Sequence, residues 1–293
     1  MSDFSSNNSL GSKSLPSIAK YLEAIGDFEA AARFRGVGGA GQGLRHAFGS
    51  DVYAYTGMIL GYIENASAAS MIEVRDASTM SADNALMDSR IKITLDKFYV
   101  QSYPGRGRHN ILCEFAGKNQ IQGDPEELRF ALSTRANDKG SAAVAGAPIF
   151  LGVSVGKNGI SFEGKTVNVS SDEDDALLGA LDSDAVKGGL SLLTSAQPAL
   201  KPFVSLTTSV VKAVASRSKN KQIFSFQLGL DFGNGSTSAR LRLGSYVVIQ
   251  ADVPSWNWSS YEWSSSLRAI VNKQTQETIP YNYLVFGVTQ FHE

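Results

Sequence analysis

The sequence predicts a mainly β protein: an antiparallel β-sandwich with N-terminal helices and an internal helical insertion. The first observation is the alternation of apolar and polar residues across 222–251, which places one set of side chains on a buried sheet face. The second is the turn chemistry between such segments, for example Pro104-Gly105 and Gly123-Asp124-Pro125. The third is a spacing that suits hairpins rather than strand–helix–strand units, typical of C2-like or jelly-roll-like sandwiches.

Size and charge limit the function classes. The chain has 293 residues, 43% of them apolar, which suffices for a large core. Its 27 basic and 28 acidic residues nearly cancel, so no nucleic-acid partner is expected. Only 19% of the residues are charged, and a weakly charged, near-neutral chain resists self-association poorly. We therefore expect a homo-oligomer.

The single cysteine and the N-terminal residues indicate a cytoplasmic protein. Cys113 alone cannot form an intrachain disulfide, which suits a reducing compartment. We expect it to be a buried, inert thiol on the strand face of Ile111 and Phe115. The first residues have the character of neither a signal peptide nor a membrane span, and no run of about 20 apolar residues follows.

The N-terminal part is expected to be a disordered tail over 1–13, rich in serine and asparagine, followed by a helical region over 14–89. Pro16 suits the first turn of a helix, and Ile18, Leu22 and Ile25 form its apolar stripe.

The segment 52–63 carries no charge and has two interpretations. The favoured one is a buried helix capped by Ser50. The alternative is one arm of a hairpin that turns at Asn65-Ala66-Ser67.

The sandwich is predicted to occupy 90–293. Its strands are expected from Arg90 to about residue 96 and near 109–116, 127–134, 148–155, 159–169, 222–232, 237–243, 245–251, 267–273 and 280–290. A helical insertion is expected at about 172–217, with one apolar face formed by Leu200, Phe203, Thr207, Val210 and Val214. Asn234-Gly235 predicts a tight hairpin turn between two of the strands, with Phe226, Leu228, Leu230, Leu241 and Leu243 buried on one face.

Two glycine-rich stretches resemble nucleotide-binding motifs. Gly36–Gly41 has the spacing of a dinucleotide fingerprint, but it follows a helix and the predicted sheet is antiparallel. Residues 228–237 resemble the first phosphate-binding hairpin of the actin, sugar-kinase and heat-shock-chaperone ATPases. Too few residues follow Thr237 for the two α/β lobes of that superfamily. We expect no nucleotide and no cofactor.

Metal and anion sites are weakly indicated. Asp172, Asp174 and Asp175 form a candidate cation site, although acidic residues before an apolar run also suit a helix N-terminus, which is the favoured interpretation. No pair of histidines has metal-ligand spacing and no Gly-x-Ser-x-Gly motif occurs, so neither a metal centre nor a catalytic site is expected. Arg106 and Arg108, in a loop after Tyr103, form a candidate phosphate or anion contact, although a solvated turn is favoured.

The best site candidate is the tryptophan segment 255–263, which holds all three tryptophans of the chain. Trp256, Trp258, Tyr261 and Trp263 form a candidate partner-binding site, because aromatic loops serve recognition of proteins, sugars or lipid headgroups. The other interpretation, slightly favoured, is that they close the end of the sandwich or pack on the N-terminal helices.

Three function classes remain. The leading one is a non-catalytic intracellular binding or self-assembly protein that acts through protein–protein contacts. The second is a membrane-acting protein, either a peripheral lipid binder or a pore former. The third is an enzyme whose site is assembled only by the fold.

Overall fold

The computed structural model describes residues 4–36, 50–65, 69–119, 126–170, 174, 178–179, 181, 200–233, 238–253 and 255–292. The strands are β1 (Met58–Glu64), β2 (Met71–Asp76), β3 (Arg90–Val100), β4 (Arg108–Asn119), β5 (Glu126–Asn137), β6 (Gly140–Ser141), β7 (Ala147–Ser154), β8 (Ile160–Val169), β9 (Lys221–Asp231), β10 (Ala239–Arg240), β11 (Gly244–Gln250), β12 (Tyr261–Ser264), β13 (Ala269–Asn272) and β14 (Asn282–Gln290). The α-helices are α1 (Leu15–Ala24), α2 (Phe28–Gly36) and α6 (Leu200–Ala215), and the short 3-10 turns are η1 (Ser6–Asn8), η2 (Leu10–Ser12), η3 (Val52–Ala54), η4 (Asn84–Leu86) and η7 (Trp258–Ser260).

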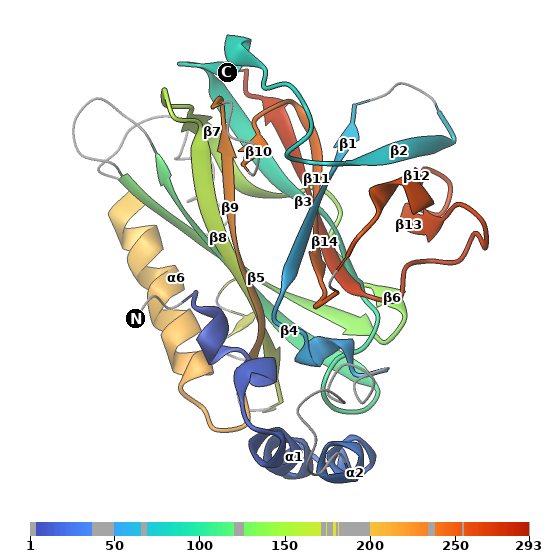
Figure 1. Ribbon diagram of the computed structural model, residues 1–293. Coiled ribbons are helices and arrows are strands. Elements are labelled where there is room, and N and C mark those ends of the chain that lie inside the picture. Colours follow the sequence, from blue (N-terminus) through green and yellow to red (C-terminus); the bar gives the residue numbers. More distant parts are fainter. Residues whose placement is uncertain are drawn as a thin grey trace.

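The strands form two sheets, which confirms the predicted mainly β, sandwich-like class. The larger sheet has the order β13-β12-β2-β1-β11-β14-β3-β6, with β7 also paired to β3, and it is strongly curled. The smaller sheet has the order β10-β9-β8-β4-β5. Figure 1 shows the two sheets facing each other, with α6 beside the smaller sheet and α1 and α2 together at one end of the molecule.

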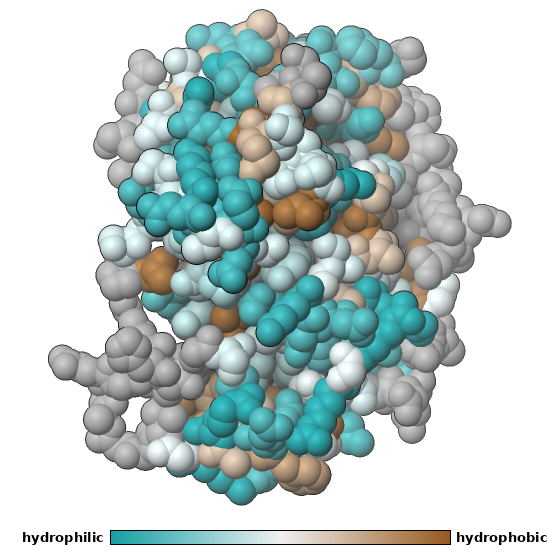
Figure 2. Space-filling view, turned by 90° about the vertical axis from the view of Figure 1, so that its right-hand side faces the viewer, coloured by the Kyte–Doolittle hydropathy of each residue, from teal (hydrophilic) through white to brown (hydrophobic). Residues whose placement is uncertain are grey.

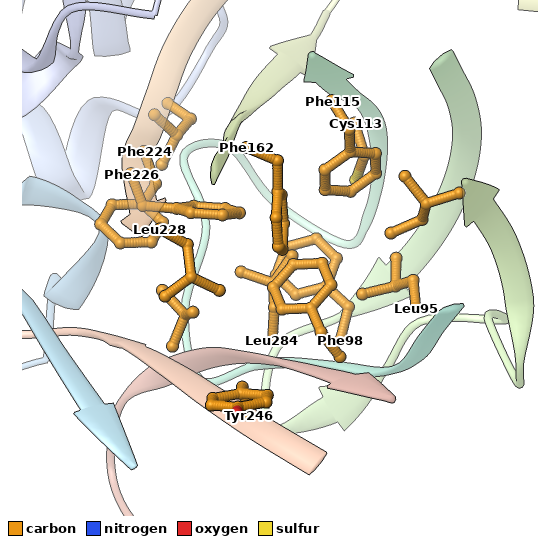
Figure 3. Packing of buried hydrophobic residues seen from close by; sticks show 14 of the residues in the cluster. Leu95, Phe98, Cys113, Phe115, Phe162, Phe224, Phe226, Leu228, Tyr246 and Leu284 are labelled. Atoms are coloured by element: carbon orange, nitrogen blue, oxygen red, sulfur yellow. The ribbon is translucent and has the colours of Figure 1, made fainter. Parts of the chain in front are cut away.

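The main core lies between the two sheets. Alternating residues of β4, β8 and β9 supply Phe115, Phe162 and Phe226, and β14 supplies Phe286 opposite them. Figure 3 shows side chains from both sheets pointing toward one another in this layer, among them Phe162, Phe226 and Leu284. Burial of such large apolar side chains is the dominant stabilising contribution to a fold of this size.

Two smaller hydrophobic cores lie on the outer faces of the two sheets. On the larger sheet, the strands at its curled end, β13, β12 and β2, which we call the curled flank, cover its outer face. This second core buries Val247, Ile249, Ile270 and Val285. The helix α6 covers part of the outer face of the smaller sheet. Its contacts with the sheet are made by Val210, Val211 and Val214 against Leu112, Ala131, Val167 and Val169. The helical insertion is confirmed over 200–215, and Thr207, Val210 and Val214 of its predicted face are buried.

The predicted strands are found with their boundaries shifted by a few residues, except for the strand after the Asn234-Gly235 turn. That turn lies outside the described residues. The returning strand was predicted over 237–243, and the structure has only the two-residue β10, which pairs parallel to β9. Four of the five residues predicted to be buried together are buried, and Leu243 is partly buried.

The predicted helix over 52–63 is wrong. Only η3 is helical there, and β1 pairs with β11 over its whole length and with β2 over Gly61–Ile63. The hairpin alternative is the one that the structure supports. Gly57 and Gly61 weaken a helix, whereas the β-branched and aromatic residues around them favour a strand. The region 14–89 is therefore not wholly helical, because β1 and β2 belong to the larger sheet.

The predicted disorder over 1–13 is wrong from Phe4 onward. Leu10 is buried in the main core, and the Gln222 side-chain amide donates hydrogen bonds to the Ser5 carbonyl and to Ser9 Oγ. Gly11 packs so closely that a Cβ there would overlap the Ala54 carbonyl. Two apolar anchors, Phe4 and Leu10, thus order a segment whose serine and asparagine content indicated disorder.

Candidate functional site

The tryptophan segment packs on the outer face of the larger sheet. Trp258, in η7, is 6% exposed, and its ring lies on Gly61 of β1. Trp256, Tyr261 and Trp263 are partly buried around it. The structure therefore brings the four predicted partner-binding residues together, and it places Trp258 beneath the surface that the others form.

Four partly exposed rings form a continuous row along this surface, which we call the aromatic row: Tyr55, Tyr281, Trp256 and Tyr261. The ring centroids are 6.2 Å apart for Tyr55–Tyr281, 5.6 Å for Tyr281–Trp256 and 4.8 Å for Trp256–Tyr261. Tyr261 stacks on Trp256 with an interplanar angle of 19°, and Tyr281 meets Trp256 edge-on. These geometries are the favoured ones for aromatic pairs, so the rings hold one another in place.

Gly61 is required by this arrangement, and substituting alanine there tests it. A Cβ at Gly61 would lie 2.6 Å from two ring carbons of Trp258. We expect Gly61→Ala to lower the free energy of unfolding by about 1–3 kcal/mol, as overpacking does. Urea unfolding followed by tryptophan fluorescence measures this loss. Gly229→Ala in β9 is the control, because a Cβ there meets nothing within 4 Å. Equal stability of the two variants would contradict the packing of Trp258 on β1.

An open hollow of about 660 Å³ adjoins the aromatic row at Tyr55, and we call it the Tyr55 hollow. It lies between the start of α1 and the paired ends of β1 and β11. Its apolar lining includes Leu15, Ile18, Ile59 and Val253.

The charged groups of the Tyr55 hollow are already engaged within the fold. Asp252 accepts hydrogen bonds from the backbone N–H groups of Thr56 and Gly57, at 3.0 and 2.5 Å. Lys13 Nζ donates to the Asn7 carbonyl at 2.6 Å. The hollow therefore offers an apolar floor with a polar rim, and these two groups are placed for structure rather than for proton transfer.

Arg106, in the loop, and Arg108, the first residue of β4, are both exposed. Arg106 Nη2 lies 3.5 Å from Glu29 Oε2, so a carboxylate of α2 already faces it. The loop is held by the Gly105 N–H, which donates to Asp27. An anion contact at this loop stays a prediction.

Asp174 is fully buried, and its carboxylate is bonded to side chains of the fold itself. Arg217 Nε lies 2.5 Å from its Oδ1, and the Asn220 side-chain amide donates to its Oδ2 at 2.5 Å. The same amide donates to the Val214 carbonyl near the end of α6. Asp172 and Asp175 lie outside the described residues. Within the described ranges, no group of three or more His, Cys, Asp or Glu residues is placed to hold a metal ion.

A buried charge cluster that no sequence pattern predicted lies on the outer face of the smaller sheet, formed by Glu114, Arg129 and Lys165. We call it the Glu114 cluster. Arg129 Nη1 lies 2.8 Å from Glu114 Oε1, and Lys165 Nζ lies 2.7 Å from Glu114 Oε2. The ring of Phe4 covers both cations, at 5.5 Å from Arg129 Cζ and 4.8 Å from Lys165 Nζ. The three residues come from three strands, so only the register of the sheet reveals the cluster.

Cys113 is fully buried next to Ile111 and Phe115, as predicted. Burial raises the pKa of its thiol to about 12, so the thiolate that a nucleophile requires is not formed near neutral pH.

Only parts of the two glycine-rich stretches lie within the described residues. Gly36 ends α2, and residues 37–43 lie outside the described residues, as do residues 234–237 of the second motif.

No helix in the described part of the chain combines the length and apolar character that a membrane span needs. Comparison with protein-family models, with curated proteins and with solved structures finds no match for this chain.

Proposed function

We propose that this chain is a non-catalytic binding protein that associates with a second copy of itself through the aromatic row and the adjoining Tyr55 hollow. The observation that carries the proposal is the row itself. Four half-exposed rings from three separate segments meet on one surface and continue into a hollow with an apolar floor. Tyrosine and tryptophan are enriched at protein interfaces because each ring buries a large area at a low cost in side-chain entropy.

Composition supports contact with another copy. The formal charge of the chain is −1, so electrostatic repulsion between copies is weak. The charged rim groups Lys13 and Asp252 have opposite signs, which suits a two-fold interface where each surface meets its own kind.

The membrane-acting alternative relies on the same rings, since tryptophan and tyrosine also suit a lipid interface. Figure 2 shows the face that carries β2, β12 and β13, where hydrophobic residues form small separate patches among hydrophilic ones. A mosaic of this kind favours a protein contact over insertion into lipid.

The test is the double variant Trp256→Ser/Tyr261→Ser, measured by light scattering coupled to size exclusion. Both side chains are partly exposed, so we expect the fold to remain while the mass of the assembly falls toward that of one chain. Loss of an aromatic pair at an interface costs about 2–4 kcal/mol, which weakens the dissociation constant by about 30-fold to 1,000-fold.

The control is Phe28→Ser, which removes an aromatic ring that is 66% exposed on α2, away from the row. Its mass should equal that of the wild type. A wild-type protein that stays monomeric at high concentration would refute the self-association. Co-sedimentation of that monomer with phosphatidylserine vesicles, lost in the double variant, would favour the membrane-acting alternative.

A further inference from the structure

Between the two sheets, the edge of β9 lies opposite the start of β1, and residues of both strands line one hollow in a region that we call the seam. In the smaller sheet, β9 pairs with β8 on one side, and on the other side only Leu230 and Asp231 pair with β10. In the larger sheet, β1 pairs with β11 over its whole length, whereas β2 pairs with Gly61–Ile63 alone. In Figure 1, β10 lies beside one end of β9 and the N-terminal turns lie near its other end.

Hydrogen-bond directions show which backbone groups of β9 face the seam. The Leu241 N–H donates to the Asp231 carbonyl, so the backbone of Asp231 points away from β8. Pairing with β8 is regular from Phe224 to Leu230, and strand backbones alternate direction with a period of two. The N–H and C=O groups of Ser225, Gln227 and Gly229 therefore also point into the seam. They have no hydrogen-bond partner among the described residues.

The edge of β1 faces the seam in the same way. The Ala77 N–H lies 3.5 Å from the Leu60 carbonyl, so that carbonyl points away from β11. By the same alternation, the backbone of Met58 points away from β11 as well. Met58 lies beyond the last residue that pairs with β2, and its side chain is 39% exposed.

A hollow of about 490 Å³ occupies the seam at this point. Three consecutive residues of β9, Ser225–Gln227, line it, which places the hollow against the strand edge rather than one face. The Ser225 side chain is 5% exposed, and its hydroxyl has no hydrogen-bond partner among the residues that the structure describes. Burial of such a hydroxyl costs free energy that a bound partner would recover. The described residues that line it carry no charged side chain.

We propose that this seam is a binding site for an extended, uncharged segment of a partner polypeptide, which adds as a strand to the edge of β9. A strand is the ligand whose own N–H and C=O groups repeat with the spacing of Ser225, Gln227 and Gly229. Alternate side chains of that strand would point toward Phe226 and toward the hydroxyl-lined rim. The segment should therefore alternate apolar and small polar residues.

The ends of the seam determine what can enter it. At one end Ala239 and Arg240 pair with β9, and at the other the Gln222 side chain holds the turns that contain Ser5 and Ser9. The edge left between them is only a few residues long and recessed, so a free tail or loop fits and the edge of a folded domain does not. Natural sheets protect free edges with lysine, proline or charge, and the segment Gln222–Leu230 has none of these.

The test is selection from a phage-displayed library of uncharged heptapeptides that alternate valine, isoleucine or phenylalanine with serine or threonine. We expect peptides to be enriched on the wild-type protein. Gln227→Pro removes one seam-facing N–H and leaves the pairing with β8, because that N–H points away from β8. It should weaken the binding of selected peptides about tenfold or more, and Gln227→Ala, which keeps the N–H, should bind like the wild type.

Amide hydrogen exchange of the wild type locates the site without any variant. On binding a selected peptide, the amides of Ser225, Gln227 and Gly229 should become more protected. No enrichment above an unrelated protein, equal affinity of the Gln227→Pro variant, or protection confined to other strands would each overturn the proposal. The inference is independent of self-association, since the variant Trp256→Ser/Tyr261→Ser should bind the selected peptides like the wild type.

Discussion

Replacing Phe286 with alanine is expected to lower the free energy of unfolding by about 3–5 kcal/mol, the range found for large aromatic side chains removed from a core. Phe286 is fully buried in β14 of the larger sheet. Its ring centroid lies 5.7 Å from Phe115, 5.4 Å from Phe162 and 5.5 Å from Phe226, which belong to three strands of the smaller sheet. One truncation therefore removes aromatic contacts between the two layers and leaves a cavity where they meet.

Urea unfolding followed by circular dichroism measures this loss. Phe28→Ala is the control, since Phe28 is 66% exposed on α2 and its removal should change stability by less than about 0.5 kcal/mol. A loss below about 1 kcal/mol for Phe286→Ala would mean that the site collapses around the cavity or that the two sheets do not meet through these rings.

Local pattern was enough to predict most of the sandwich. Along β9, Phe224, Phe226, Leu228 and Leu230 face the core, and alternation alone identified them. The burial of Cys113 followed from the same period of two. Such signals are strong because each strand of the smaller sheet has one face toward the main core.

Pairing between distant segments could not be predicted in this way. The segment 52–63 is apolar on both faces because β1 lies between the main core and the core of the curled flank, so its alternation is masked. The run resembled a buried helix for that reason. The predicted strand over 237–243 was wrong because the Arg240 N–H donates to the carbonyl of Ala77, a residue that is its neighbour only in the fold. Phe4 was missed because its partners, Arg129 and Lys165, come from strands far along the chain.

The candidate site was predicted in part. The clustering of Trp256, Trp258, Tyr261 and Trp263 follows from their closeness in sequence. Tyr55 and Tyr281, which complete the aromatic row, lie about 200 residues and about 25 residues away from Trp256, and no local pattern connects them. The seam could not be predicted from the sequence either, because an edge of a strand is free only when no other strand pairs with it, and pairing is decided by the fold.

The Glu114 cluster gives the second large effect. Its carboxylate is fully buried between two cations, whose side chains are 13% exposed for Arg129 and 7% exposed for Lys165. Removing one partner of a buried ion pair costs far more than the pair contributes, because the opposite charge stays out of water without its counter-charge.

Glu114→Gln keeps the shape of the side chain and removes its charge, so both cations then face a neutral amide. We expect the free energy of unfolding to fall by about 3–5 kcal/mol, measured by urea unfolding at neutral pH. Glu127→Gln is the matched control. Glu127 Oε1 lies 3.2 Å from the same Arg129 guanidinium, but its side chain is 61% exposed. Water screens that pair, so its removal should cost less than about 1 kcal/mol. Similar losses in the two variants would show that burial under Phe4 does not decide the strength of the cluster. The further variant Phe4→Ala separates the effect of burial from the effect of ion pairing, because it opens the cluster to water. In a Phe4→Ala background, the losses caused by Glu114→Gln and by Glu127→Gln should therefore differ less than in the wild type.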